Sequence, residues 1–86
     1  MTEEAKELHR TIGATVRDML DAYRIQAQVG RVSEEALEGI LFRAAHPIVN
    51  SLAPYPTDQR AALLPSVVRI MLAAFLEEIA REGETR

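Results

Sequence analysis

The sequence predicts an all-α fold: a small antiparallel helical bundle of three main helices plus one short helix, with the last helix at its centre. Two long segments carry apolar residues every three or four positions, which is the spacing of one helix face. A third segment, 67–76, is apolar around its whole circumference except at Arg69. Residues typical of helix starts and ends separate the segments. With 86 residues and no linker composition, the chain is expected to form a single domain, 1–86.

The first helix is predicted over about 3–29. Thr2 is a suitable N-cap, and Glu3 and Glu4 place carboxylates in the first turn, where they interact favourably with the helix dipole. Gly30 suits the left-handed conformation that ends many helices, so a tight turn should follow. The apolar residues of this helix fall on one arc: Leu8, Ile12, Val16, Met19, Leu20, Tyr23 and Ala27.

The second helix is predicted over about 34–52, with Ser33 as its cap. Pro47 lies inside this segment, and the apolar period continues past it. Because an internal proline removes one hydrogen bond and clashes with the preceding turn, we expect a kink at position 47 and not a full break. The apolar arc consists of Leu37, Ile40, Leu41, Ala44, Ala45, Ile48, Val49 and Leu52.

The third part of the chain is predicted to contain two helices. The stretch 53–56, with two prolines, should be extended and polyproline-like, and Thr57 should cap a short helix over 58–64. Pro65 is favourable in the first turn of a helix, so the last helix is expected over 65–82. It should stop at Gly83, leaving a frayed tail over 83–86.

The apolar segment 67–76 also predicts self-association. A helix without a polar face must be surrounded, and a chain of this length has only about two other long helices to cover it. The most economical cover is a second copy in a homodimer, packed through the first and last helices. The expected partner or dimer interface comprises Val67, Val68, Met71, Leu72, Phe75, Leu76, Leu8, Ile12, Val16 and Met19.

A basic stripe runs along one border of the first helix. Its members, spaced by seven residues, are Arg10, Arg17, Arg24 and Arg31. A stripe of this kind can hold phosphates or an acidic partner. Glu7 and Asp21 stand at helical spacing from these arginines and can pair with them, which favours the interpretation of a solvated flank.

A small polar patch is expected beside Pro47, where Arg43, His46 and Asn50 project from the second helix. It could hold a small anion or a partner, but no nucleophile or oriented carboxylate accompanies it, and His46 is interpreted as an exposed helix residue. The chain has no cysteine, and its two histidines lack a metal-binding register. No catalytic, cofactor or metal site is therefore expected.

The composition favours a cytoplasmic protein. The net charge of −3 argues against nucleic acid as the main partner, and the longest apolar run is too short to span a membrane. The acidic N-terminus lacks the apolar run of a secretory signal.

The function expected from these observations is a non-enzymatic protein–protein interaction module, a small regulator, adaptor or inhibitor whose partners are itself and another, larger protein or complex. Two alternatives stay open. One is a nucleic-acid-associated regulator that uses the arginine stripe, and the other is an accessory subunit of an enzyme.

Overall fold

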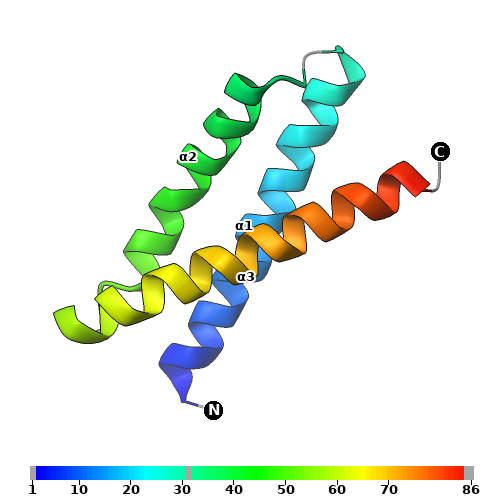
Figure 1. Cartoon of the computed structure of the whole chain (residues 1–86). Coiled ribbons are helices and arrows are strands. Elements are labelled where there is room, and N and C mark those ends of the chain that lie inside the picture. Colours follow the sequence, from blue (N-terminus) through cyan, green and yellow to red (C-terminus); the bar gives the residue numbers. More distant parts are fainter. Residues whose placement is uncertain (1, 31, 85–86) are drawn as a thin grey trace.

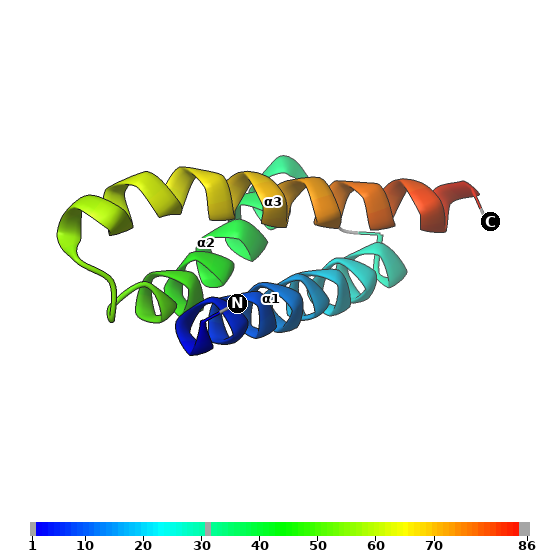
Figure 2. The same cartoon turned by 90° about the horizontal axis from the view of Figure 1, so that it is seen from below.

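The computed structural model describes residues 2–30 and 32–84, and over those residues it contains helices joined by short turns and no strand. It contains α1 (Glu3–Gln28), α2 (Glu34–Ser51) and α3 (Thr57–Glu84). In Figure 1, α1 and α2 form an antiparallel hairpin and α3 crosses over α1. Figure 2 shows α3 as a separate layer over α1, while the N-terminal end of α2 rises to the level of α3. The molecule is a flat slab of 42 × 24 × 15 Å.

The predicted N-caps of the first two helices, Thr2 and Ser33, are confirmed. The Thr2 hydroxyl accepts a hydrogen bond from the Ala5 amide at 3.2 Å, and the Ser33 hydroxyl accepts one from the Ala36 amide at 3.1 Å. Both caps satisfy amides that have no partner within the helix. Gly30 has a φ of 68°, the left-handed conformation in which glycine is favoured. These local signals produce the hairpin of α1 and α2.

The helix α2 continues through Pro47 without a break. Pro47 is exposed, as is Arg43 one turn earlier, so water can reach the Arg43 carbonyl that loses its helical hydrogen bond. The Ser51 hydroxyl in turn donates to the Pro47 carbonyl at 2.9 Å. The local environment therefore tolerates the proline.

The short fourth helix predicted from the sequence is not a separate element. One helix, α3, runs continuously through Pro65 and past Gly83 to Glu84. Pro65 and Ala61 are both exposed, so the carbonyl left without an amide partner can be hydrated. Of the tail expected to fray, Gly83 and Glu84 belong to α3, and positions 85–86 lie outside the described residues.

The connection between α2 and α3 also differs from the predicted extended segment. It is a hydrogen-bonded turn in which the Tyr55 amide donates to the Leu52 carbonyl at 3.1 Å. Thr57 is the first residue of α3 and not its cap, because the Arg60 amide donates to the Pro56 carbonyl at 2.9 Å. Tyr55 packs against the core, which favours the folded-back turn over an extended chain.

The core lies between the hairpin and the middle of α3, and its apolar members are Leu8, Met19, Leu20, Ile40, Ala44, Ile48, Leu52, Val67, Met71 and Phe75. The helix that packs against both others is α1, and not the last helix as the sequence suggested. The reason is that only one side of α3, bearing Val67, Met71 and Phe75, reaches the hairpin. Its other sides remain open to solvent.

Candidate functional site

The ten residues predicted for an interface divide between core and surface. Five of them, Leu8, Met19, Val67, Met71 and Phe75, are buried within the single chain. Ile12 and Val16 of α1 and Val68 and Leu72 of α3 are half-buried, and Leu76 is 60% exposed. The structure therefore uses the inner side of α1 for its own core. Among these ten residues, Leu76 of α3 leaves the most apolar surface available to a partner.

An apolar groove, which we call the α2–α3 groove, lies between the N-terminal half of α2 and the C-terminal half of α3. Its volume is about 240 Å³. The lining residues come from all three helices and the α1–α2 turn: Tyr23, Val32, Leu37, Leu41, Leu72, Phe75, Leu76 and Ile79. The rings of Tyr23 and Phe75 meet edge to face with centroids 6.1 Å apart, an arrangement that aromatic pairs prefer.

Acidic side chains border the α2 side of this groove. Glu34 and Glu38 are exposed, and each precedes a groove-lining leucine of α2, Leu37 or Leu41, by three residues, so helical spacing puts them beside the groove residues on the same side of α2. Neither carboxylate makes an ion pair with a residue in the described part of the chain. This combination could not be predicted from the sequence, because the groove forms only once α2 and α3 have both packed against α1.

A second exposed surface, with both apolar and charged residues, is the side of α3 that faces away from the hairpin, which we call the α3 outer face. All its members are exposed: Ser66, Arg69, Ile70, Ala73, Leu76, Glu77 and Ala80. Ile70 is 56% exposed, and Leu76 borders both this face and the α2–α3 groove. The prediction that one chain cannot cover the whole segment 67–76 agrees with this exposure.

The arginine stripe is partly neutralised by the pairs expected from helical spacing. Arg10 bonds to Glu7 at 3.2 Å, and Arg24 bonds to Asp21 at 3.2 Å. Arg17 makes no ion pair among the described residues, so the expected pair with Asp21 is not formed. Arg31, the fourth member of the stripe, lies outside the described residues.

Arg24 also makes a contact that helical spacing did not predict. Its Nε donates a hydrogen bond to Glu82 Oε1 at 2.7 Å, which joins α1 to α3. This hydrogen bond is the main cause that raises the pKa of Arg24 above its ordinary value, and the charges of Glu82 and Asp21 act in the same direction. Arg24 is therefore engaged within the fold and is not a free member of the stripe.

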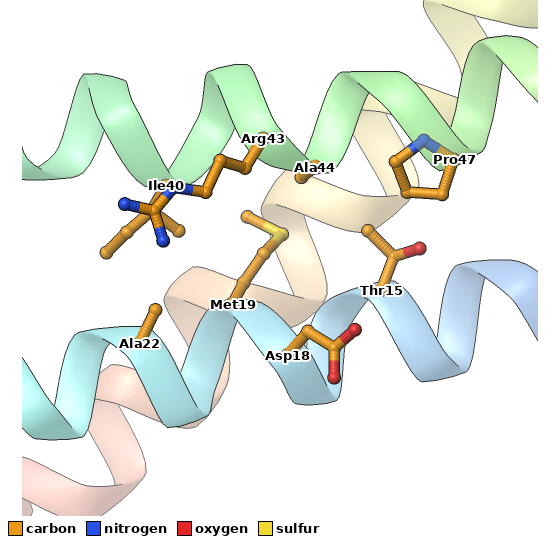
Figure 3. A pocket seen from close by; sticks show the side chains of 8 residues that line it. All are labelled: Thr15, Asp18, Met19, Ala22, Ile40, Arg43, Ala44 and Pro47. Atoms are coloured by element: carbon orange, nitrogen blue, oxygen red, sulfur yellow. The ribbon is translucent and has the colours of Figure 1, made fainter.

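The predicted polar patch stays on the surface of α2, where Arg43, His46 and Asn50 are all exposed. Arg43 is the one of the three that lines a cavity of about 210 Å³ between α1 and α2. In Figure 3, Arg43 extends along α2 over Ile40, whereas Asp18 projects from α1 without meeting it. The patch thus contributes a single cation to this cavity, and no ion pair joins Arg43 to Asp18.

The outward side of α2 exposes apolar residues that were either not predicted as surface features or predicted to be buried. Phe42 is 83% exposed, and Ala45 and Val49, both expected on the buried arc, are exposed as well. The signal for Phe42 is present in the sequence, since it stands outside the apolar arc centred on Ile40, Ala44 and Ile48. Only α1 and α3 could have covered Ala45 and Val49, and both lie on the opposite side of α2.

Across the described residues, no group of three or more His, Asp or Glu side chains is placed to hold a metal ion. None of the three helices, over the positions that are described, combines the length and apolar content needed to cross a membrane. Comparisons of the chain with protein-family models, with curated proteins and with solved structures give no match.

Proposed function

We propose that this protein is a non-enzymatic protein–protein interaction module, a small regulator, adaptor or inhibitor that binds an amphipathic helix of a larger protein. The observation that carries the proposal is the α2–α3 groove, an open cavity lined by aliphatic and aromatic side chains from every helix. Exposed apolar surface of this kind on a small protein is typical of interaction sites.

The dimensions and lining of the groove favour a protein segment over a small molecule. Its volume of about 240 Å³ is below the range of about 300–1,000 Å³ found for small-molecule sites. Small-molecule sites also place a few polar groups to orient the ligand, whereas the hydroxyl of Tyr23 is the single polar side-chain group here. One or two anchor side chains of an amphipathic helix would fill such a groove.

The charges at the edge of the groove favour a partner helix with basic flanks. Glu34 and Glu38 supply negative charge on the α2 side. The nearest arginine of α1 along the chain from Tyr23 is Arg24, whose charge is already compensated by Glu82 and Asp21. Lysine or arginine residues beside the apolar anchors would therefore gain favourable electrostatic contacts, which mainly increase association rate and specificity.

A direct test is selection of binders from a displayed library of 20-residue helical peptides. We expect enrichment of peptides with apolar residues at positions i, i+3 or i+4 and i+7, flanked by lysine or arginine. Val32→Lys should weaken their binding at least tenfold, because it places a charge in the apolar groove. Val49→Lys is the matched control, since Val49 is equally a surface valine but lies on α2 away from the groove.

Isothermal calorimetry with the selected peptides and these two variants gives the affinities. Peptides that bind both variants as tightly as the wild type would place their site elsewhere and contradict the proposal. Equal enrichment of acidic-flanked and basic-flanked peptides would contradict the assigned role of Glu34 and Glu38.

A further inference from the structure

The single chain exposes more surface than a compact protein of its size. Its accessible surface is 6207 Å², whereas a compact monomer of 9.6 kDa exposes about 5,100 Å². Its radius of gyration is 14.1 Å, compared with about 12 Å for a compact domain of this length. The excess of about 1,100 Å² exceeds the roughly 800 Å² that each partner buries in a standard interface. Burial of this surface against a second copy of the chain would remove the excess.

The order of apolar and charged residues along the α3 outer face is complementary to the same order read in the opposite direction. Counted outward from Ala73, Ile70 and Leu76 stand three residues away on either side. Arg69 and Glu77 stand four residues away, with opposite charges. Suppose that two copies of α3 cross antiparallel at Ala73. The two-fold axis then brings each residue before Ala73 in one chain level with the residue that follows Ala73 by the same number of positions in the other chain.

We propose that two copies of this chain form a two-fold dimer through the α3 outer face, with the two α3 helices antiparallel and crossing at Ala73. Arg69 of each chain then pairs with Glu77 of the other, and Ile70 lies level with Leu76. Leu76 belongs both to this surface and to the lining of the α2–α3 groove, and the other groove-lining residues lie outside the proposed dimer interface.

The charged groups on this face are free to make the proposed pairs. Arg69 is exposed and makes no ion pair with any residue that the structure describes. Glu77 approaches Arg81 only at 3.9 Å, and Arg81 is more closely bonded to Glu78 at 2.5 Å. An antiparallel dimer would therefore form two ion pairs between the chains without breaking a close ion pair within either chain.

The side chains at the crossing point also permit close approach. Ala73 is exposed and small, so two α3 helices can approach at the short end of the range of 8–10 Å for packed helices. Ile70 and Leu76, exposed by 56% and 60% in the single chain, would then be covered on both sides of the axis. Val67, Met71 and Phe75 keep their places in the core on the opposite side of α3.

Charge reversal tests the register of this dimer by analytical ultracentrifugation between 1 and 200 µM. The wild type should have about twice the chain mass of 9.6 kDa. Arg69→Glu makes both charged positions acidic, and Glu77→Arg makes both basic. Because the two-fold axis doubles each like-charge contact, each single variant should raise the dimer dissociation constant at least tenfold. Both positions are exposed, so circular dichroism should be unchanged.

Two further combinations of these substitutions distinguish the proposed register from a general effect of charge. An equimolar mixture of the Arg69→Glu and Glu77→Arg chains should form a heterodimer, because every cross-chain contact then joins opposite charges. The double variant Arg69→Glu/Glu77→Arg should dimerise with itself again, within about threefold of the wild type.

Disulfide trapping locates the axis, and the natural absence of cysteine makes the result unambiguous. Ala73→Cys should form a covalent dimer rapidly under mild oxidation, because the two Cβ atoms face each other near the 3.5–4.5 Å that a disulfide requires. Ala45→Cys, at an exposed alanine of α2, is the matched control and should remain mostly uncrosslinked.

A monomeric wild type, variants that dimerise like the wild type, or no preference for cross-linking at position 73 would each overturn the proposal. Peptide binding in the α2–α3 groove is measured separately and responds to Val32→Lys. Failure of that binding with an intact antiparallel dimer would reject the proposed function alone.

Discussion

Arg17 and Arg24 lie two turns apart on the same flank of α1, yet their surroundings differ. Arg24 bonds to Asp21 within α1 and to Glu82 of α3, whereas Arg17 has no ion pair among the described residues. Since Glu82 raises the pKa of Arg24, any stability linked to its protonation is complete below the ordinary arginine pKa and is lost only as the pH rises above it. Titration of Arg24 therefore causes no change in stability near neutral pH.

Arg24→Gln should lower the urea midpoint of unfolding more than Arg17→Gln does, because only Arg24 joins two helices. The Arg17 substitution, at an exposed helix position, should stay within about 0.5 kcal/mol of the wild type. The difference between the variants should shrink in 1 M NaCl, where salt screens exposed charges over about 3 Å. Equal midpoints at low salt would show that the contact with Glu82 contributes nothing.

The arginine stripe is also expected not to bind nucleic acid. Arg10 and Arg24 are engaged with carboxylates, which leaves Arg17 as the unpaired member among the described residues. Fluorescence anisotropy with duplex and single-stranded DNA at 150 mM salt should show no binding. Binding that disappears in the triple variant Arg10→Gln/Arg17→Gln/Arg24→Gln would revive that alternative. The log–log salt slope should then fall by about 0.7–0.9 for each lost arginine.

At the scale of the elements, Pro65 decides whether the last part of the chain contains one helix or two. A proline at the first position of a separate helix is favourable, whereas a proline inside a continuous helix is less favourable than alanine by about 3 kcal/mol. The structure places Pro65 well inside α3, on its exposed side. The two possibilities predict opposite effects of replacing it.

Pro65→Ala should therefore stabilise the protein by about 2 kcal/mol, after allowing about 0.4–1 kcal/mol for the more flexible unfolded chain. Urea unfolding measures the change, with an unchanged m-value. Gln59→Ala, at another exposed position of α3, is the control and should change stability by less than about 0.7 kcal/mol. A neutral or destabilising effect of Pro65→Ala would favour two separate helices.

At the scale of the whole molecule, the thin slab and the small core couple folding to association. Among the described residues, its core contains ten buried apolar residues, of which Ile48 is the one with no exposed surface. Small domains bury a low fraction of their surface and are marginally stable alone. A partner that covers the α3 outer face would add stability by mass action.

The urea midpoint should accordingly rise with protein concentration. For a dimer that dissociates as it unfolds, each tenfold increase in concentration stabilises the folded state by about 1.4 kcal/mol per dimer. Unfolding followed by circular dichroism at 2 and 200 µM checks this. Identical midpoints would mean that the single chain carries all the stability.

The sequence by itself determined the helical class, the caps at Thr2 and Ser33, and the end of α1 at Gly30. These features depend on neighbours within a few residues, so local spacing and residue type suffice to predict them. The sequence also identified segment 67–76 as more apolar than one chain of this length can cover, and in the structure Ile70 and Leu76 remain exposed.

The tertiary structure decided what local patterns leave open. Packing of Val67, Met71 and Phe75 against the hairpin keeps α3 continuous with Pro65 on its exposed side, where water can satisfy the backbone. It also made α1 the helix that contacts both others, joined Arg24 to Glu82, and created the α2–α3 groove. These features depend on which side of each helix meets another helix, and residues far apart in sequence meet only after the chain has folded.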